Sequence, residues 1–342
     1  MRVLDAGGWT DTWFAGHGSV CNVAVSDGTE VSVDLSSPSR DGEAVVDLRI
    51  RSFGERYSFS VHAPPNRHPL LETAVRRSCP PGASVEVEVA SSVPPGSGLG
   101  TSASVVVALV AALRVAAGET MVAGELAVEA HHIETEELGL QSGLQDQICA
   151  AYGGANLIVV GSYPTAEVRS LQLSNETWEE LARRLVTVYL GAPHQSSSVH
   201  EAVIARLASL ASTDRDELLS PLRSAAHHAA LALVAGDIDA YGEAMIHNTE
   251  AQTLLHPGIV RSRAQEVIGL ASSLGAAGWK VNGAGGDGGS VTIVCPEDPA
   301  RVLAELDSMS GVTRLQLEPT RQGARVIDSD SEGWGFESLR GR

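Results

Sequence analysis

Short runs of Val, Ile and Leu, several of them alternating with polar residues, dominate about the first 90 residues of the chain. Gly, Pro, Asp and Ser separate these runs, a pattern typical of short β-strands joined by turns. The strict alternation at Val85–Val89 predicts a strand with one buried face. The predicted strands are Val20–Val25, Val31–Leu35, Val45–Ile50 and Val85–Val89.

A long apolar run follows the last of these strands and predicts a buried helix over Val105–Ala117. A mixed apolar face predicts a second helix over Gly124–Leu138, and the apolar run Asn156–Val160 predicts a buried strand. The loop before Val105 therefore joins a strand to a helix.

The hydrophobic pattern changes after about residue 165. A strand is followed there by several helices and then by strand, helix and strand, an order that suits a split βαβ sandwich. The expected helices are Ser198–Leu210, Leu218–Ala235, Ile238–Leu255, Arg263–Leu274 and Pro299–Leu306. The expected strands are Leu185–Leu190, Val291–Val294 and Val312–Leu317. The tail from Asp328 onward is polar and rich in glycine, and we expect it to fray.

Composition narrows the class of protein. With 342 residues the chain can bury a large core, and its size suggests two domains. No apolar stretch reaches the roughly 18 residues of a membrane span. There is no signal-peptide pattern and the four cysteines are scattered, so we expect a soluble, cytoplasmic protein. A formal charge of −18 disfavours nucleic acid and anionic membranes as partners.

Three glycines, Gly96, Gly98 and Gly100, punctuate the loop before the first predicted helix. Such a loop can direct backbone N–H groups and the positive end of a helix at one anion, so it indicates a site for a nucleotide polyphosphate. A P-loop is disfavoured because the only lysine in the chain is Lys280. The spacing also differs from that of the dinucleotide-binding fingerprint. The alternative is a glycine-rich turn that only caps a core helix.

The N-terminal segment carries the groups best suited to a polyol. Gly7 and Gly8 predict a tight turn that leaves Trp9, Thr10 and Asp11 exposed on a loop. A carboxylate and a hydroxyl side by side can accept and donate hydrogen bonds to sugar hydroxyls. The alternative is an Asx turn with Trp9 in the core.

Two carboxylates and a second glycine loop complete the candidate chemistry. Glu134, on a predicted helix, and Asp146, on a predicted loop, can divide the tasks of holding a metal ion and orienting an attacking hydroxyl. The alternative for the acidic cluster around Glu134 is a solvated helix face. Asn282–Ser290 contains five glycines and predicts a loop dominated by its backbone, with a flexible hairpin connection as the alternative.

The first glycine loop resembles the second motif of the GHMP kinases, the family of galactokinase and of homoserine, mevalonate and phosphomevalonate kinases. Pro94–Ala103 matches Pro-x-x-x-Gly-Leu-Gly-Ser-Ser-Ala with one substitution, Thr101 for the first serine. Gly7–Thr12 resembles the sugar-binding loop of the L-fucokinase kinase module and is similar to that of the D-glycero-D-manno-heptose 7-phosphate kinases. Gly283–Gly289 resembles the third motif, which packs beside the phosphate loop. The three motifs occur in the family's order and spacing.

The resemblance implies an α+β fold of two domains. Residues 1–165 would form the N-terminal, nucleotide-binding domain, residues 166–327 a C-terminal domain with a ferredoxin-like βαβ sandwich, and residues 328–342 a flexible tail. The implied reaction is ATP-dependent phosphorylation of a sugar at its anomeric hydroxyl, with D-glycero-D-manno-heptose 7-phosphate or a similar heptose as acceptor. Two alternatives stay open: a kinase for an unphosphorylated sugar such as L-fucose, and a non-catalytic sensor of sugar and ATP. A homodimer is also left open.

The resemblance also implies roles for single residues. Asp146 would be the catalytic base, and Arg2 would lie near the reacting hydroxyl. Mg²⁺ would bind Ser102 and Glu134, with Glu136 as the competing ligand. The expected sugar-binding residues are Thr10, Asp11 and Gly283. The expected nucleotide-binding residues are Pro95, Gly96, Ser97, Gly98, Leu99, Gly100, Thr101, Ser102, Gly285 and Gly286.

Besides Thr101, the chain departs from the family pattern at three places. Only Met1 precedes Arg2 where the family has several residues, so the first strand is shortened or the start codon is misassigned. Asp287 interrupts the glycines of the third motif, and we expect it to point to solvent or toward the sugar or metal. His194 and Gln195 stand where heptose-phosphate kinases have basic residues. Candidate arginines for a substrate phosphate are Arg261, Arg263 and Arg321.

Overall fold

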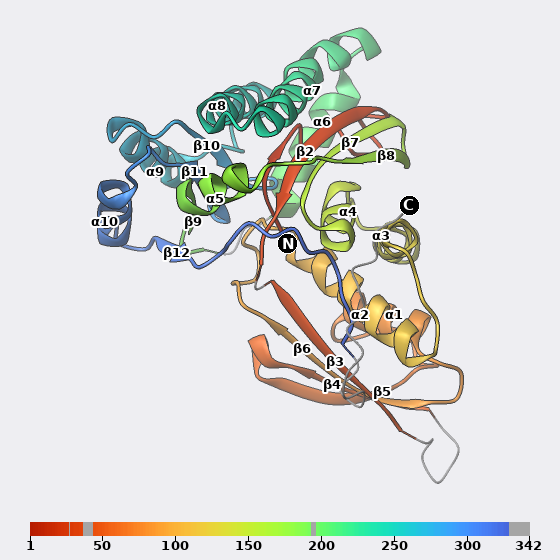
Figure 1. The fold of residues 1–342 in the computed structure, drawn as a ribbon. Helices are drawn as coiled ribbons and strands as arrows, with labels where there is room; N and C mark the ends of the chain where they lie inside the picture. The colour runs from red at the N-terminus through yellow and green to blue at the C-terminus, as the bar shows by residue number, and fades with distance from the viewer. Residues whose placement is uncertain (27, 37–43, 193–195, 328–342) are drawn as a thin grey trace.

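The computed structural model describes residues 1–26, 28–36, 44–192 and 196–327, and Figure 1 shows their arrangement. The predictions for His194, Gln195 and the tail from Asp328 lie outside these residues. Within them the strands form three four-stranded sheets, with helices packed against each. The strands and helices predicted from the hydrophobic pattern are all found. None of the described helices has the length and apolar character that crossing a bilayer requires.

The first sheet positions the N-terminal segment and is antiparallel throughout. Its order is β1 (Arg2–Ala6), β2 (Gly18–Ala24), β7 (Ala155–Ser162) and β8 (Thr165–Ser170). β1 and β2 are buried along their whole length. The helices packed against them are α4 (Gln145–Tyr152), α7 (Ser212–Ala235) and α8 (Ile238–Leu255). The domain boundary at residue 165 stays a prediction, and β8 begins there as the partner of β7.

The second sheet, at the bottom of Figure 1, leads into the glycine loop. Its order is β3 (Thr29–Ser36), β6 (Ser84–Ser91), β4 (Val45–Ile50) and β5 (Glu55–Ser60), with only the β4–β6 pair parallel. A short 3₁₀ turn, η1 (Arg51–Phe53), joins β4 to β5, and α1 (Pro69–Ser78) follows. β6 runs through the glycine loop into α2 (Thr101–Ala116), whose buried Val and Leu side chains share a core with those of β4 and β6. α3 (Ala123–His132) and a π turn, η2 (Ile133–Glu137), come next.

The third sheet confirms the predicted ferredoxin-like arrangement. Its antiparallel order is β10 (Gly278–Val281), β11 (Ser290–Val294), β9 (Leu185–Tyr189) and β12 (Thr313–Leu315). Because the chain order is strand, helices, two strands, helix and strand, this spatial order is that of a split βαβ sandwich. The remaining helices are α5 (Asn175–Arg184), α6 (Ser196–Ser209), α9 (Ser262–Ser273) and α10 (Ala300–Ser308).

The predicted placement of Asp146 on a loop is wrong. Asp146 lies in the first turn of α4, a helix of 8 residues that the hydrophobic pattern does not predict. Such a short helix buries few apolar side chains, Ile148 and Cys149 among them, so its periodicity is hard to recognise. The consequence is favourable for a site, because a side chain at a helix start is held more rigidly than one on a loop.

Candidate active site

A cavity of about 610 Å³ lies where the three sequence motifs meet. The glycine loop at residues 95–102 lines it together with residues 9, 11 and 12, residues 141–143, 145 and 146, and residues 283–284. Side chains from η1, from the start of α1 and from β6 line it as well. The cavity therefore lies between the second sheet and three other regions: the segment after β1, the start of α4 with the loop before it, and the third motif.

The glycine loop has the backbone geometry that a phosphate site requires. Gly96, Gly98 and Gly100 all have positive φ, at 69°, 74° and 71°. Two of these glycines also have no room for a side chain. A Cβ on Gly98 would lie 2.8 Å from the carbonyl oxygen of Asn282, and one on Gly100 would lie 2.9 Å from the Asp146 carboxyl carbon. The loop ends at the start of α2, so backbone N–H groups and a helix N-terminus face one cavity.

The third motif packs beside this loop, as expected. The Ser290 hydroxyl donates to the carbonyl oxygen of Ser97 at 2.6 Å, and Gly283 lies against Gly98. Gly285 and Gly286 do not line the cavity; they pack against Ile259, whose carbonyl oxygen accepts from the Gly286 N–H. Of the third motif, Gly283 therefore reaches the cavity, whereas the expected nucleotide contacts of Gly285 and Gly286 have no counterpart in its lining.

Arg2 and Asp146 form an ion pair at the cavity. The Arg2 Nε lies 2.7 Å from Asp146 Oδ1, and its Nη1 donates to the carbonyl oxygen of Gly98 at 2.5 Å. Burial opposes the charge on Arg2, but Asp146 and Asp5 raise its pKa above the ordinary value. The Asp146 side chain remains 25% exposed, so it is fixed by Arg2 while staying accessible from the cavity.

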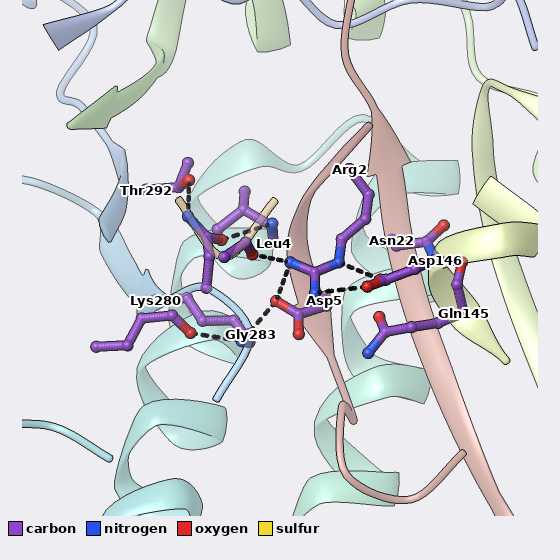
Figure 2. A network of polar contacts seen from close by, with 12 residues as sticks. Arg2, Leu4, Asp5, Asn22, Gln145, Asp146, Lys280, Gly283 and Thr292 are labelled. Atoms are coloured by element: carbon purple, nitrogen blue, oxygen red, sulfur yellow. Dashed lines mark hydrogen bonds and ion pairs between the residues drawn. The ribbon is translucent and has the colours of Figure 1, made fainter. Parts of the chain in front are cut away.

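Behind this pair lies a second ion pair that the sequence analysis did not identify (Figure 2). Lys280, on β10, is fully buried, and its Nζ donates to Asp5 Oδ1 and to the Val281 carbonyl oxygen, each at 2.8 Å. Burial would raise the pKa of Asp5, but Arg2 and Lys280 together lower it. The sequence feature that could have indicated this buried ion pair is a lone lysine inside the apolar strand sequence Gly-Trp-Lys-Val.

Asp11 lies in the cavity wall without a cationic partner among the described residues. It is 1% exposed, and its Oδ2 accepts the Gln145 N–H at 2.9 Å. Burial raises its pKa to about 6, the nearby Asp146 carboxylate adds to the shift, and the Gln145 N–H opposes it. Gly143 must be glycine here, because a Cβ would lie 2.3 Å from Asp11 Oδ2. Asp11 therefore lines the cavity, and its role as a sugar ligand stays a prediction. The predicted exposure of Trp9, Thr10 and Asp11 on a loop is wrong, because all three are buried.

Thr10 does not line the cavity. It is fully buried. Its hydroxyl donates to the Gly7 carbonyl oxygen at 2.8 Å, and the hydroxyl oxygen of Thr10 accepts the Ser19 N–H at 3.1 Å. These bonds close the turn that places Asp11. Trp9 lines the cavity and is 5% exposed, and Thr12 lines it beside Trp9.

Glu134 and Ser102 supply the oxygen atoms that a hard cation prefers. Glu134 is buried one side chain behind the cavity: Gln147 Nε2 donates to its Oε2 at 2.9 Å and to the hydroxyl of the cavity residue Ser142 at 3.1 Å. No hydrogen-bond partner meets its Oε1 among the described residues, and burial raises the pKa of Glu134 to about 7. Ser102 is exposed to the cavity.

A Mg²⁺ ion fits these residues. An orphaned carboxylate oxygen and a hydroxyl are typical protein ligands of an ion whose remaining positions go to water and substrate phosphates. Glu136, the competing ligand, is exposed. The described residues contain no cluster of three or more His, Cys, Asp or Glu side chains suited to a metal, so the ion would depend on the nucleotide for further ligands.

The candidate arginines for a substrate phosphate lie elsewhere. Arg261 pairs with Asp287, which is 74% exposed and turned to solvent. Arg263 pairs with Glu266, and Arg321 lies over the Trp178 ring. Of the orientations expected for Asp287, the structure shows the one toward solvent. None of the three arginines lines the cavity.

The comparisons agree on one family. Residues 70–154 match the model for the GHMP kinases N terminal domain. The chain is 26% identical over 239 residues to the D-glycero-alpha-D-manno-heptose 7-phosphate kinase of Campylobacter jejuni, covering 69% of this chain and 68% of that protein. It is 26% identical over 251 residues to the mevalonate kinase of Thermococcus onnurineus, covering 72% and 70%.

Solved structures show the same fold. A D-glycero-D-manno-heptose 1-phosphate kinase from Bacteroides thetaiotaomicron superposes with a TM-score of 0.73 at 20% identity, covering 96% of this chain and 98% of that one. The Methanococcus jannaschii mevalonate kinase gives 0.71 at 17% identity, covering 89% and 92%. The galactose complex of Lactococcus lactis galactokinase gives 0.67 at 17% identity, covering 91% and 90%. Residues 70–154 thus carry the N-terminal domain of the GHMP kinases, a family of phosphotransferases, and the chain has the fold of that family.

Proposed function

We propose that this protein is a sugar kinase that transfers the γ-phosphate of ATP to the anomeric hydroxyl of its acceptor. The observation that carries the proposal is the Arg2–Asp146 ion pair, which lies against the glycine loop in the wall of one cavity. A positioned carboxylate beside a polyphosphate site is the arrangement that phosphoryl transfer to an alcohol requires.

Each residue contributes a defined step. Backbone N–H groups of the glycine loop and the start of α2 hold the phosphates, and Asp11 accepts hydrogen bonds from sugar hydroxyls. Asp146 orients the attacking hydroxyl and takes its proton as the new P–O bond forms and the bond to ADP breaks. Arg2 stabilises charge near the reacting oxygen. Mg²⁺ held by Ser102 and Glu134 would neutralise charge on the phosphate oxygens.

The preference for the anomeric hydroxyl rests on the segment Gly7–Thr12. It resembles the corresponding loop of kinases that act at that position, and the structure has Asp11 of this segment in the cavity wall. By the same resemblance the acceptor is D-glycero-D-manno-heptose 7-phosphate or a similar heptose, in keeping with the name of the Campylobacter jejuni relative.

One observation favours an unphosphorylated acceptor, such as L-fucose, as a second candidate. The arginines that line the cavity in the described part of the chain are Arg2 and Arg67, and both are ion-paired. Arg67 binds Glu55 at 2.9 Å and lies over the Tyr57 ring. An acceptor phosphate would thus find no uncommitted arginine in this lining and would meet Asp11 and Asp146.

A coupled ADP-release screen over free and phosphorylated hexoses and heptoses tests the proposal. ADP release with heptose 7-phosphates supports the first candidate, and release with free sugars alone supports the second. ATP binding without turnover of any sugar would contradict a sugar kinase and favour a sensor, and turnover of mevalonate alone would assign a different acceptor class.

A further inference from the structure

We propose that Lys280 is a positioning residue that acts through Asp5 and Arg2 on Asp146. The inference rests on the proposed function, since it treats Asp146 as the group that orients the acceptor. Lys280 itself touches neither the cavity nor Asp146: it is fully buried on β10, and the bonds of its Nζ go to Asp5 and to the Val281 carbonyl oxygen.

Four charged groups alternate in sign from the core to the cavity (Figure 2). Lys280 lies 2.8 Å from Asp5, the Asp5 carboxylate lies 3.6 Å from Arg2 Nη1, and Arg2 Nε lies 2.7 Å from Asp146. The exposed fraction of these side chains is 0% for Lys280, 2% for Asp5 and 4% for Arg2, and it rises to 25% for Asp146. The row thus begins in the core and ends where an acceptor would bind.

The backbone of β1 is distorted in a way that creates this row. In a regular strand Arg2 and Asp5 would point to opposite faces, because side chains alternate. The β1–β2 register slips between Val3 and Ala6, and Leu4 has a φ of 52°, a left-handed conformation that is unfavourable for a branched side chain. The bulge brings Asp5 to the side of Arg2, and Asn282 Oδ1 accepts the Leu4 N–H at 3.3 Å.

Lys280 determines which of two carboxylates the Arg2 guanidinium pairs with. Arg2 lies between two carboxylates, Asp5 and Asp146, and a cation attracts both of them. With Lys280 on Asp5, two cations match two carboxylates, and the Arg2 Nε–H is left for Asp146. Without Lys280, the buried Asp5 charge would draw the Arg2 guanidinium inward and leave Asp146 without its anchor.

The kinetic test uses Lys280→Met, which removes the charge and keeps the length of the side chain. We expect kcat per folded enzyme to fall about 10- to 100-fold, as small displacements of reacting groups do, with both KM values changed less than about 3-fold. The matched control is Tyr241→Phe on α8, which removes a buried hydroxyl that has no hydrogen-bond partner among the described residues and should leave kcat unchanged.

The double variant Asp5→Asn/Lys280→Met separates positioning from simple loss of packing. With both charges gone, Arg2 has only Asp146 to pair with, so kcat should recover at least about 5-fold relative to Lys280→Met. This variant leaves neither member of the buried pair unmatched, so it also serves if Lys280→Met does not fold; its kcat should then stay within about 10-fold of the wild type. An unchanged kcat in Lys280→Met, or a double variant no better than the single one, would overturn the proposal.

A spectroscopic test needs no acceptor and so is independent of the proposed function. Lys280 is the only lysine in the sequence, and untagged protein labelled with ¹³C,¹⁵N-lysine gives a single Cε–Nζ signal. Asp146→Asn should shift this signal, because it releases Arg2 toward Asp5, whereas Asp34→Asn, an exposed change on β3, should not. An unshifted signal in Asp146→Asn would contradict coupling along the row even in an enzyme that turns over a sugar.

Discussion

Asp5 and Asp11 belong to the same N-terminal segment, and each is 1% exposed, yet their surroundings differ in charge. Lys280 and Arg2 neutralise Asp5, and its pKa is lowered. Asp11 accepts one N–H from Gln145, no described cation pairs with it, and burial raises its pKa to about 6. One carboxylate is satisfied by the protein, whereas the other keeps bonding capacity unused.

The difference separates groups that hold the site from groups that meet a ligand. A buried carboxylate without a cation is costly for folding, since its charged form loses hydration that the protein does not replace. Asp11 and Glu134 share this condition, and both lie in the region where the proposed sugar and metal would bind. The charge-paired row of Lys280, Asp5, Arg2 and Asp146 is complete without a ligand.

The largest expected effect is on kcat, and it comes from Asp146, at the cavity end of the charge-paired row. Asp146→Asn should lower kcat at least ~10²-fold with little change in ATP affinity, because general-base contributions are typically about 10²- to 10⁴-fold. Steady-state kinetics with nucleotide-binding titrations provide the measurement. Asp146→Glu should fail as well if geometry matters, and near-normal turnover by Asp146→Asn would remove this residue from the mechanism.

Asp11 should instead affect acceptor binding. Asp11→Ala should raise the acceptor KM about 10-fold or more, since hydrogen bonds to charged groups contribute about 1.5–3 kcal/mol, while the ATP KM changes little. Asp11→Asn, which keeps an acceptor oxygen for the Gln145 N–H, should lie between wild type and Asp11→Ala. An equal rise in both KM values would show that Asp11 supports the nucleotide site or the fold.

The metal prediction concerns the second carboxylate without a cation. Glu134→Gln and Ser102→Ala should each raise the Mg²⁺ concentration needed for half-maximal rate, and excess Mg²⁺ should partly restore turnover, because each removes one oxygen ligand. Glu136→Gln is the matched control and should behave as wild type, since Glu136 is exposed. The reverse pattern would assign the ligand role to Glu136.

A smaller effect of Asp11 should appear in the way the free energy of unfolding depends on pH. The pKa of Asp11 is about 6 in the fold against an ordinary 3.8, so the folded state holds the proton more tightly. This contribution to stability is full below pH 3.8 and is lost as pH rises through 6. Asp11→Asn should therefore gain about 1–3 kcal/mol relative to wild type between acidic and neutral pH, at about 1.4 kcal/mol per pKa unit.

Urea unfolding of Asp11→Asn and wild type at about pH 4.5 and about pH 7 measures this change in relative stability. Asp34→Asn, exposed on β3, is the control and should follow wild type. A constant difference between Asp11→Asn and wild type at both pH values would mean that Asp11 is ionised throughout.

The hydrophobic pattern predicts the elements whose buried faces are long. Val105–Ala117 and Ile238–Leu255 are recognised because apolar residues recur over several turns. The exposed strand β8 and the largely polar helix α5 bury few side chains and give no such signal. β8 is instead held by its pairing with β7, and α5 by the Ser174 cap together with the few side chains that it buries.

The spacing of the motifs predicts that Asp11, Asp146 and the glycine loop share one site. It does not predict three local features. Thr10 turns into the core because its hydroxyl closes a backbone turn. The bulge at Leu4 depends on Asn282, and Asp5 depends on Lys280, partners near the other end of the chain. Pairings over such separations leave no periodic trace in the sequence.

Proton NMR of the product, with and without phosphorus decoupling, tests the central claim most directly. The proposed site holds the sugar through Asp11 with the anomeric oxygen toward Asp146 and the γ-phosphate. We therefore predict that H1 of the product gains a coupling to phosphorus, and that sugars reduced at the anomeric carbon are not phosphorylated. A new coupling that appears only on exocyclic methylene protons would contradict anomeric transfer.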